Sequence, residues 1–347
     1  MNRKLPRALS QAASIAALLA CFAQVALAAD PPASGTFKPT AQDKIVPASA
    51  KVELLWNEGE FTEGPAPAAD GAILFSDIGN RIYRYDPRSG KTAVYRDPSG
   101  KSNGLKFDPK GNLVACEGAA PGGARRISIT DDKGNVRTLA DRFDGKRFNS
   151  PNDLAITTKG NVYFTDPRYV GDESRELDFE GVFLVAPAGE VRVATREVQK
   201  PNGIIVTPDD RRVYVADNSN LANGAHQLLA FTVQSDGTLA EKRVLFDFGS
   251  ERRGIDGMTL DVEGNIYATA GSGPEAGIYV FGPEGQELAF IAMPGSPSNC
   301  VFGVGDQART LYITGAGPRP ADATGRGPYG LYRITLAVPG YHVFPRR

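Results

Sequence analysis

From about Lys51 onward the chain repeats one pattern of apolar and polar positions. An apolar stretch leads to a turn built on Asp, Pro, Lys and Gly, then to a strand rich in Val, Ile, Tyr and Phe, and then to a further amphipathic strand. Each repeat holds three or four segments with strict alternation, and none holds a convincing amphipathic helix. The pattern therefore predicts an all-β protein.

The repeat can be followed through six copies. Five of them share a turn position, occupied by Gly71, Gly111, Gly160, Asp210 and Gly264 and spaced by 40 to 54 residues. Steps of this size are typical of propeller blades. A sandwich needs no such repeat, and a parallel β-helix would repeat at a shorter period. We expect a six-bladed β-propeller over residues 51–347.

A short polar phrase stands just before the turn in every copy. It reads TEG at 62–64, SNG at 102–104, PND at 151–153, PNG at 201–203, IDG at 255–257 and SNC at 298–300. In a propeller the first strand of each blade lines the central channel, so equivalent residues at its entry end form a ring. The predicted ring consists of Glu63, Asn103, Asn152, Asn202, Asp256 and Asn299.

All six side chains of the ring carry oxygen, and none is Lys, Arg, His or Cys. Such donors suit a hard cation such as calcium, and two carboxylates balance a divalent charge. Any one of the phrases, taken alone, is more often a turn cap than a ligand. Six phrases in register, with Glu63 at a position where a turn role is unnatural, favour a metal site.

The first residues have the layout of a secretory signal peptide. Arg3, Lys4 and Arg7 precede an apolar stretch, and small residues follow at Ala26 and Ala28. We expect cleavage after Ala28 and a periplasmic or secreted protein. The alternatives are an uncleaved anchor, for which the apolar run is short, and a lipoprotein. Residues 29–50 lack periodicity and are expected to form a flexible leader.

The charge balance and the cysteine count limit the kinds of partner and covalent cross-link that the sequence predicts. The chain has 39 Lys and Arg against 40 Asp and Glu, and loss of residues 1–28 removes three cations and leaves a net charge of −4. No basic face for nucleic acid is implied, and we expect no stable membrane insertion after signal cleavage. Cys116 and Cys300 remain, and we expect two buried free thiols rather than a disulfide.

The chain resembles the family of senescence marker protein (regucalcin), gluconolactonase and luciferin-regenerating enzyme. The likeness runs from about Trp56 to Tyr332, through FTEGPAPAADGAILFSDIGNRIYRYDP, FNSPNDLAITTKGNVYFTDPRY, PNGIIVTPDDRRVYVAD and GIDGMTLDVEGNIYAT. The gluconolactonase-like branch is the nearest in these motifs. Diisopropyl-fluorophosphatase shares the ligand pattern more distantly.

The resemblance implies one divalent metal, usually calcium, bound by Glu63, Asn152, Asn202 and Asp256. Asn103 and Asn299 are then available to the substrate or to a metal-bound water. Bacterial relatives often read CEHG where this chain reads CEGA from Cys116. A histidine near the site is therefore missing, and the substrate preference is expected to differ.

The resemblance favours a sugar-lactone hydrolase that opens the ring to the aldonic acid. Asp256 is our choice for the general base, with Glu63 mainly a charge anchor; direct attack by Asp256 on the substrate stays open. His226 lies in the glycine-containing loop NGAHQ and His342 lies near residue 347, so neither a Ser-His-Asp triad nor a histidine metal cluster is readable. The alternatives are other metal-dependent chemistry, such as organophosphate hydrolysis or a sugar-acid rearrangement, and a non-catalytic calcium-binding propeller.

Overall fold

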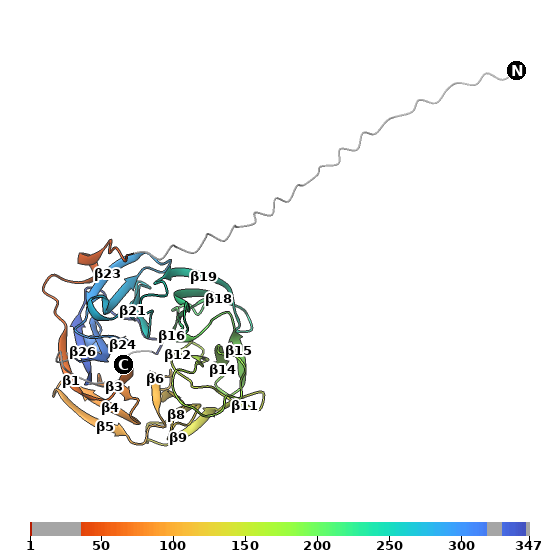
Figure 1. The fold of residues 1–347 in the computed structure, drawn as a ribbon, viewed down its shortest axis with the longest axis horizontal. Coiled ribbons are helices and arrows are strands. Elements are labelled where there is room, and N and C mark those ends of the chain that lie inside the picture. Colours follow the sequence, from red (N-terminus) through yellow and green to blue (C-terminus); the bar gives the residue numbers. More distant parts are fainter. Residues whose placement is uncertain (2–35, 318–327, 345–347) are drawn as a thin grey trace. The chain divides into compact units, whose positions relative to one another are not determined.

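Six four-stranded antiparallel sheets are arranged around a central axis, which confirms the predicted six-bladed propeller (Figure 1). The structure is a computed structural model and describes residue 1, residues 36–317 and residues 328–344. The expected signal peptide over residues 1–28 lies outside the described residues, apart from Met1. Among the described ranges, no helix has the length and apolar character needed to cross a membrane.

The first three blades follow one another along the chain, each running from an inner to an outer strand. Their strands are β2 (Thr62–Pro67), β3 (Ile73–Asp77), β4 (Arg81–Asp86) and β5 (Lys91–Arg96); β6 (Ser102–Phe107), β7 (Leu113–Glu117), β8 (Arg126–Thr130) and β9 (Val136–Ala140); and β12 (Leu154–Ile156), β13 (Val162–Thr165), β14 (Val182–Val185) and β15 (Val191–Thr195). A short hairpin of β10 (Arg142–Phe143) and β11 (Lys146–Arg147) precedes the third blade.

The remaining blades repeat the arrangement. Their strands are β16 (Pro201–Val206), β17 (Arg212–Asn218), β18 (His226–Val233) and β19 (Leu239–Asp247); β20 (Met258–Leu260), β21 (Ile266–Ala270), β22 (Gly277–Phe281) and β23 (Glu287–Ala292); and β24 (Pro297–Phe302), β25 (Thr310–Ala316), β26 (Tyr329–Thr335) and β1 (Glu53–Gly59). Two 3-10 turns, η1 (Gly273–Glu275) and η2 (Gly305–Gln307), lie in the fifth and sixth blades.

The sixth blade contains strands from both ends of the chain. Strand β1 pairs antiparallel with β26, with Glu53 opposite Arg333 and Leu54 opposite Tyr332. The Arg333 Nε also lies 2.8 Å from a carboxylate oxygen of Glu53. The ring is therefore closed by backbone hydrogen bonds between an early and a late strand.

The hydrophobic core is divided among the spaces between neighbouring blades. Six buried clusters are found among the described residues, and each is shared mainly by two adjacent sheets. In one of them Phe164 and Phe183 of the third blade lie beside Val114 and Cys116 of the second. Inner strands are buried on both faces, so the apolar packing surrounds the channel and fixes the positions of the strands that line it.

The turns between first and second strands have the geometry expected from the repeat. Gly71, Gly111, Gly160 and Gly264 all have φ between 81° and 88°, a region that favours glycine. Asp210 takes the same place with φ 57°. Its carboxylate accepts hydrogen bonds from the backbone N–H and hydroxyl of Thr158, which holds this non-glycine residue in position.

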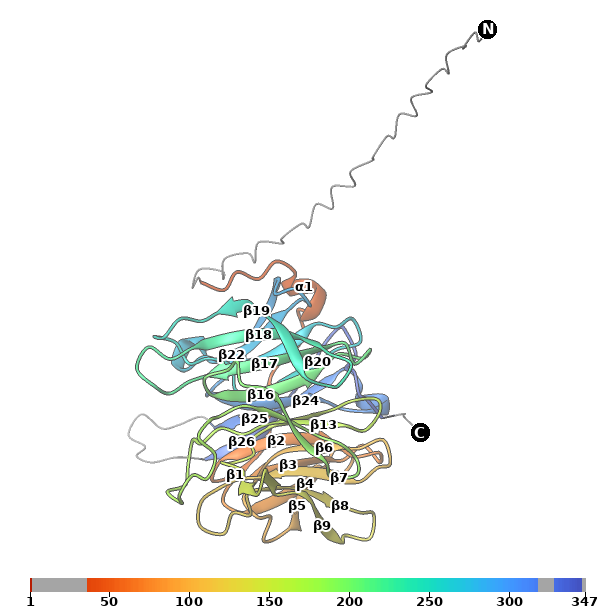
Figure 2. The same ribbon diagram turned by 90° about the vertical axis from the view of Figure 1, so that its right-hand side faces the viewer.

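Residues 36–50 differ from the flexible leader expected for residues 29–50. Phe37 packs edge-on against Phe246, Tyr279 and Phe281, between the fourth and fifth blades. The backbone of Ala41 donates to Leu288, and the helix α1 (Gln42–Ile45) lies at the rim beside the outer strand β23. Figure 2 shows α1 at the edge of the ring. A single aromatic anchor with backbone hydrogen bonds orders this segment without any periodic pattern.

Candidate active site

Five of the six predicted ring residues come together in one pocket of about 430 Å³ at one end of the central channel. They are Glu63, Asn103, Asn152, Asn202 and Asp256. A pocket of this volume is large enough for a small organic molecule. The repeat therefore placed these residues at equivalent points of five blades.

The sixth residue, Asn299, does not line this pocket. Its side chain is buried, with Nδ2 donating to Asp153 at 3.5 Å and Oδ1 accepting the backbone N–H of Cys300 at 2.8 Å. A Cβ on Gly257 would stand 2.1 Å from the Asn299 amide carbon, so the side chain fills the space beneath its neighbour. Asn299 therefore makes a structural contact with Asp153, and its predicted role toward the substrate or a metal-bound water stays a prediction.

Glycines after the ring residues let the inner strands approach closely. Gly104 donates its N–H to Asn152 O at 2.8 Å, and Gly203 donates to Asp256 O at 2.7 Å. A Cβ at position 203 would lie 2.2 Å from that same carbonyl oxygen. The backbone of one blade thus supports the ring residue of the next.

Carboxylates at the ends of second strands hold the loops that carry the ring residues. Asp166 accepts the backbone N–H groups of Asn149 and Ser150, both at 2.7 Å, just ahead of Asn152. Asp217 likewise accepts the N–H groups of Gln199 and Lys200. Asp166 therefore acts as a loop cap and not as a pocket-lining group.

Two carboxylates of the site share one buried region. Burial raises the pKa of Glu63 well above its ordinary value, and the charges of Asp256 and Asp153 raise it further. Burial also raises the pKa of Asp256, while Arg253 lowers it. The positive charge of Arg253 therefore compensates the charges of Glu63 and Asp256 only in part, because the pKa of each carboxyl stays raised.

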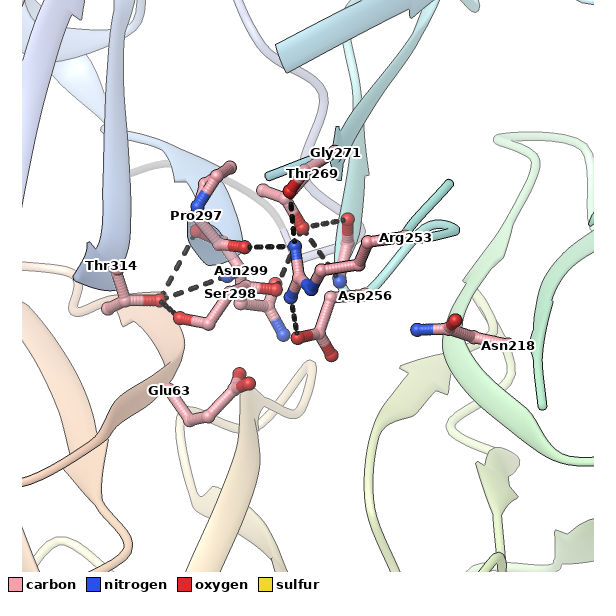
Figure 3. Close-up of polar contacts among 12 residues, drawn as sticks. Glu63, Asn218, Arg253, Asp256, Thr269, Gly271, Pro297, Ser298, Asn299 and Thr314 are labelled. Carbon is pink, nitrogen blue, oxygen red and sulfur yellow. Dashed lines mark hydrogen bonds and ion pairs between the residues drawn. The ribbon is translucent and has the colours of Figure 1, made fainter. Parts of the chain in front are cut away.

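The arrangement of these groups is visible in Figure 3. The carboxylates of Glu63 and Asp256 are directed into the same space, and Asn218 enters it from the other side. Arg253 donates from Nη2 to Asp256 Oδ2 at 2.5 Å. Among the described residues, Arg253 and Asp256 form an ion pair within the lining of the pocket.

The donor set fits a hard cation. Glu63 and Asp256 would supply charged oxygens, and Asn152 and Asn202 would supply amide oxygens from the same pocket. Among the described residues, no three His, Cys, Asp or Glu side chains form a metal cluster. A metal here would therefore depend on the amides as well as on the two carboxylates.

Several pocket residues were missed by sequence reasoning, namely Lys101, Tyr169, Asn218 and Arg253. Lys101 has a φ of 60° and immediately precedes β6, so no strand periodicity marks it as a pocket residue. The Tyr169 hydroxyl donates to the carbonyl oxygen of Asn218 at 2.7 Å, and burial keeps the pKa of Tyr169 well above its ordinary value. Tyr169 therefore lines the pocket with its side chain held in place by a hydrogen bond.

The remaining reactive side chains are engaged elsewhere. Cys116 and Cys300 are free and buried, which confirms the expectation of two buried thiols, and burial raises the pKa of each. The two ring nitrogens of His226 lie 2.8 Å and 3.1 Å from backbone oxygens. No described histidine lines the pocket.

The far end of the channel is covered by the C-terminal segment 341–344. This segment and the inner strands of all six blades enclose a small space of about 70 Å³. The backbone of Tyr341 donates to Leu260 O at 2.9 Å, which holds the segment against the fifth blade. The pocket with the carboxylates lies at the opposite end.

Comparison with known proteins extends this description. Residues 61–317 match the family model described as the SMP-30/gluconolactonase/LRE-like region. The chain belongs to this family. Among the family's characterised proteins, gluconolactonase from Zymomonas mobilis is 33% identical over 301 residues, covering 78% of this chain and 81% of the relative.

More distant relatives and solved structures agree with this membership. Regucalcin from Xenopus laevis is 24% identical and covers 84% of this chain and 97% of its own. A gluconolactonase structure from Xanthomonas campestris superposes with a TM-score of 0.72 at 28% identity, over 88% of this chain and 95% of that chain. The resemblance seen in the sequence motifs is thereby confirmed, together with the fold.

Proposed function

We propose that the protein hydrolyses a sugar lactone to the aldonic acid and uses one divalent metal ion, calcium, held by Glu63, Asn152, Asn202 and Asp256. The observation that carries the proposal is the pocket that two buried carboxylates line together with two asparagine residues. Relatives named as gluconolactonases supply the substrate class, and regucalcin-like relatives support the choice of calcium.

The reaction needs an acceptor for a proton and a place for negative charge. Water adds to the lactone carbonyl carbon, the ring carbon–oxygen bond breaks, and the ring oxygen leaves as a hydroxyl after receiving a proton. A bound divalent ion would supply positive charge that polarises the carbonyl. Asp256 is the group that would accept the proton from water, the role of a general base.

The other pocket residues orient the substrate. Lys101, Asn103 and Asn218 line the pocket with polar groups that can bond to sugar hydroxyls, and Tyr169 lines it beside Asn218. Gly118 and Ala119 also line the pocket, where many bacterial relatives are expected to carry a histidine. The small residues leave more room there and favour a lactone with a bulkier substituent on that side.

The predicted signal peptide supports a place for this reaction outside the cytoplasm. We propose that the mature enzyme acts in the periplasm or after secretion. An export assay on the intact precursor, with the N-terminus of the mature protein sequenced, tests this part. Retention of residues 1–28 in the mature protein would contradict it.

A lactone panel tests the proposed activity. Five- and six-membered aldonolactones and a phosphotriester are assayed with calcium, after chelation, and after calcium is restored. We expect lactone hydrolysis that chelation abolishes and calcium restores. Asp306→Asn is a matched control, since Asp306 is an exposed carboxylate on the turn after β24. Turnover of the phosphotriester alone, or activity unaffected by chelation, would contradict the proposal.

A further inference from the structure

The guanidinium of Arg253 is fixed at three points beside the carboxylate pair. Nη1 donates to Pro297 O at 2.9 Å and to Gly271 O at 3.4 Å, and Nη2 donates to Asp256 Oδ2. Gly271 follows β21 and Pro297 begins β24, so the two carbonyls belong to neighbouring blades. The arginine therefore joins the fifth and sixth blades while it holds Asp256.

This contact decides which oxygen of Asp256 is available. Oδ2 is used by Arg253, and Figure 3 shows the other oxygen directed toward the space between Glu63 and Asn218. The Asp256 backbone is also fixed, because its N–H donates to Thr269 O and its carbonyl accepts from Gly203. With both the main chain and Oδ2 held, the carboxylate has one orientation toward the pocket.

We propose that Arg253 is a positioning residue that orients Asp256 for metal binding and for proton transfer. The proposal rests on the proposed metal site and goes beyond its four ligands. A hydrogen bond from a neighbouring residue to a metal-ligating side chain fixes the orientation of that ligand. Loss of such a bond commonly reduces metal affinity or activity by about 10–100-fold. Arg253 reaches Asp256 through a hydrogen bond and is not itself a ligand.

A rival role makes the opposite prediction. A positive charge next to Asp256 also repels a divalent cation, so an arginine that only competed with the metal would weaken its binding. Removal of a competitor tightens calcium binding, whereas removal of a positioning residue weakens it. The sign of the change in affinity therefore separates the two roles.

The experiment measures calcium dissociation constants by calorimetry for the full-length mature protein at fixed ionic strength. Arg253→Met removes both the charge and the hydrogen bonds, and Arg253→Lys keeps the charge but loses the planar fork. Arg252→Met is the matched control, because Arg252 donates from Nε to Phe248 O and does not line the pocket. Thermal unfolding without calcium checks that each variant folds.

We expect Arg253→Met to bind calcium about 10–100-fold more weakly than the wild type, Arg253→Lys to recover part of the loss, and Arg252→Met to bind normally. The value of kcat should fall in Arg253→Met even at saturating calcium, with KM changed less. Should Arg253→Met fail to fold, the same comparison is made with Arg253→Lys, whose calcium affinity must then fall below that of the wild type.

Equal or tighter calcium binding by the folded Arg253 variants overturns the positioning role. This outcome is distinct from a failure of the proposed function, in which the wild type itself binds no calcium and the metal site is rejected along with the role of Arg253. Loss of affinity in Arg252→Met equal to that in Arg253→Met also overturns the proposal, since the loss would then not depend on the contact with Asp256.

Discussion

Gly203 donates its backbone N–H to the carbonyl oxygen of Asp256 at 2.7 Å, across the boundary between the fourth and fifth blades. The bond connects the residue that follows one predicted metal ligand with another predicted ligand. A Cβ at position 203 would stand 2.2 Å from that oxygen. The geometry of the site therefore depends on the absence of a side chain at this position.

Gly203→Ala should destabilise the protein by about 1–3 kcal/mol, because the added methyl group forces the two inner strands apart. Calcium affinity should fall as well, since Asn202 and Asp256 move relative to each other. Urea unfolding and calorimetry measure the two effects. Gly134→Asn is the control, because Gly134 has φ 82° with open space around it and Asn tolerates positive φ. Unchanged stability in Gly203→Ala would show that the strands can relax.

The two carboxylates should respond differently to neutralisation. Asp256→Asn keeps an oxygen for the metal but removes the proton acceptor, so kcat should fall by roughly 10²–10⁴-fold even at saturating calcium. Glu63→Gln should weaken calcium binding and regain turnover when calcium is in excess. Steady-state kinetics over a calcium titration distinguish the two. Full recovery of Asp256→Asn at high calcium would make Asp256 a ligand only.

Calcium affinity should fall as the pH is lowered toward the ordinary carboxylate range. The pKa of Glu63 is raised by burial and by Asp256, so the folded protein takes up a proton there at a higher pH than the unfolded chain does. Protons then compete with calcium, by at most about tenfold per pH unit for each proton. Calorimetry at about unit steps between roughly pH 5 and 8 measures how calcium affinity depends on pH.

The same shift has the opposite effect on the metal-free protein. A carboxyl group with a raised pKa favours the folded state at low pH, and this contribution is lost as the pH rises through the raised value. Without calcium, the free energy of unfolding should therefore decrease with rising pH over this window, and Glu63→Gln should flatten the dependence. A metal-free stability that rises with pH there would contradict the assignment.

Phe37→Ala should lower the free energy of unfolding by about 1–2 kcal/mol, since a partly buried ring that contacts three aromatic side chains is lost. Lactonase activity should stay unchanged, because the ring packs at the rim and not in the pocket. Lys38→Ala is the control at an exposed neighbouring position. Chemical unfolding with an activity assay at the same temperature measures both. An equal loss in the control would show that the aromatic contacts of Phe37 do not account for the effect.

The blades and five ring residues could be predicted because they depend on local, repeated information. Alternating apolar residues define each strand, and the turn glycines set the register, so equivalent residues reach the same end of the channel. Even Asp210, which breaks the glycine pattern, was aligned correctly and has a positive φ. The repeat itself thus carried the architecture.

The features that the sequence did not predict depend on contacts between residues far apart in the chain. Arg253 is held by Pro297, and Asn299 is turned toward Asp153, yet no periodic pattern marks either pair. Phe37 is a lone aromatic in a segment without alternation, and only the surface of the fourth and fifth blades gives it a place to pack. Such pairings follow from the three-dimensional packing of the blades.

The pairing of β1 with β26 has a consequence for the order in which the protein can be completed. Among the described strands, β1 is the first to be made, but its partner β26 (Tyr329–Thr335) is the last. Until β26 is available, β1 has no strand to pair with, and the sixth blade lacks its two outer strands. The ring can therefore close only after the strands of all six blades have been synthesised, and loss of a few residues at either strand would open the circle that holds the site together.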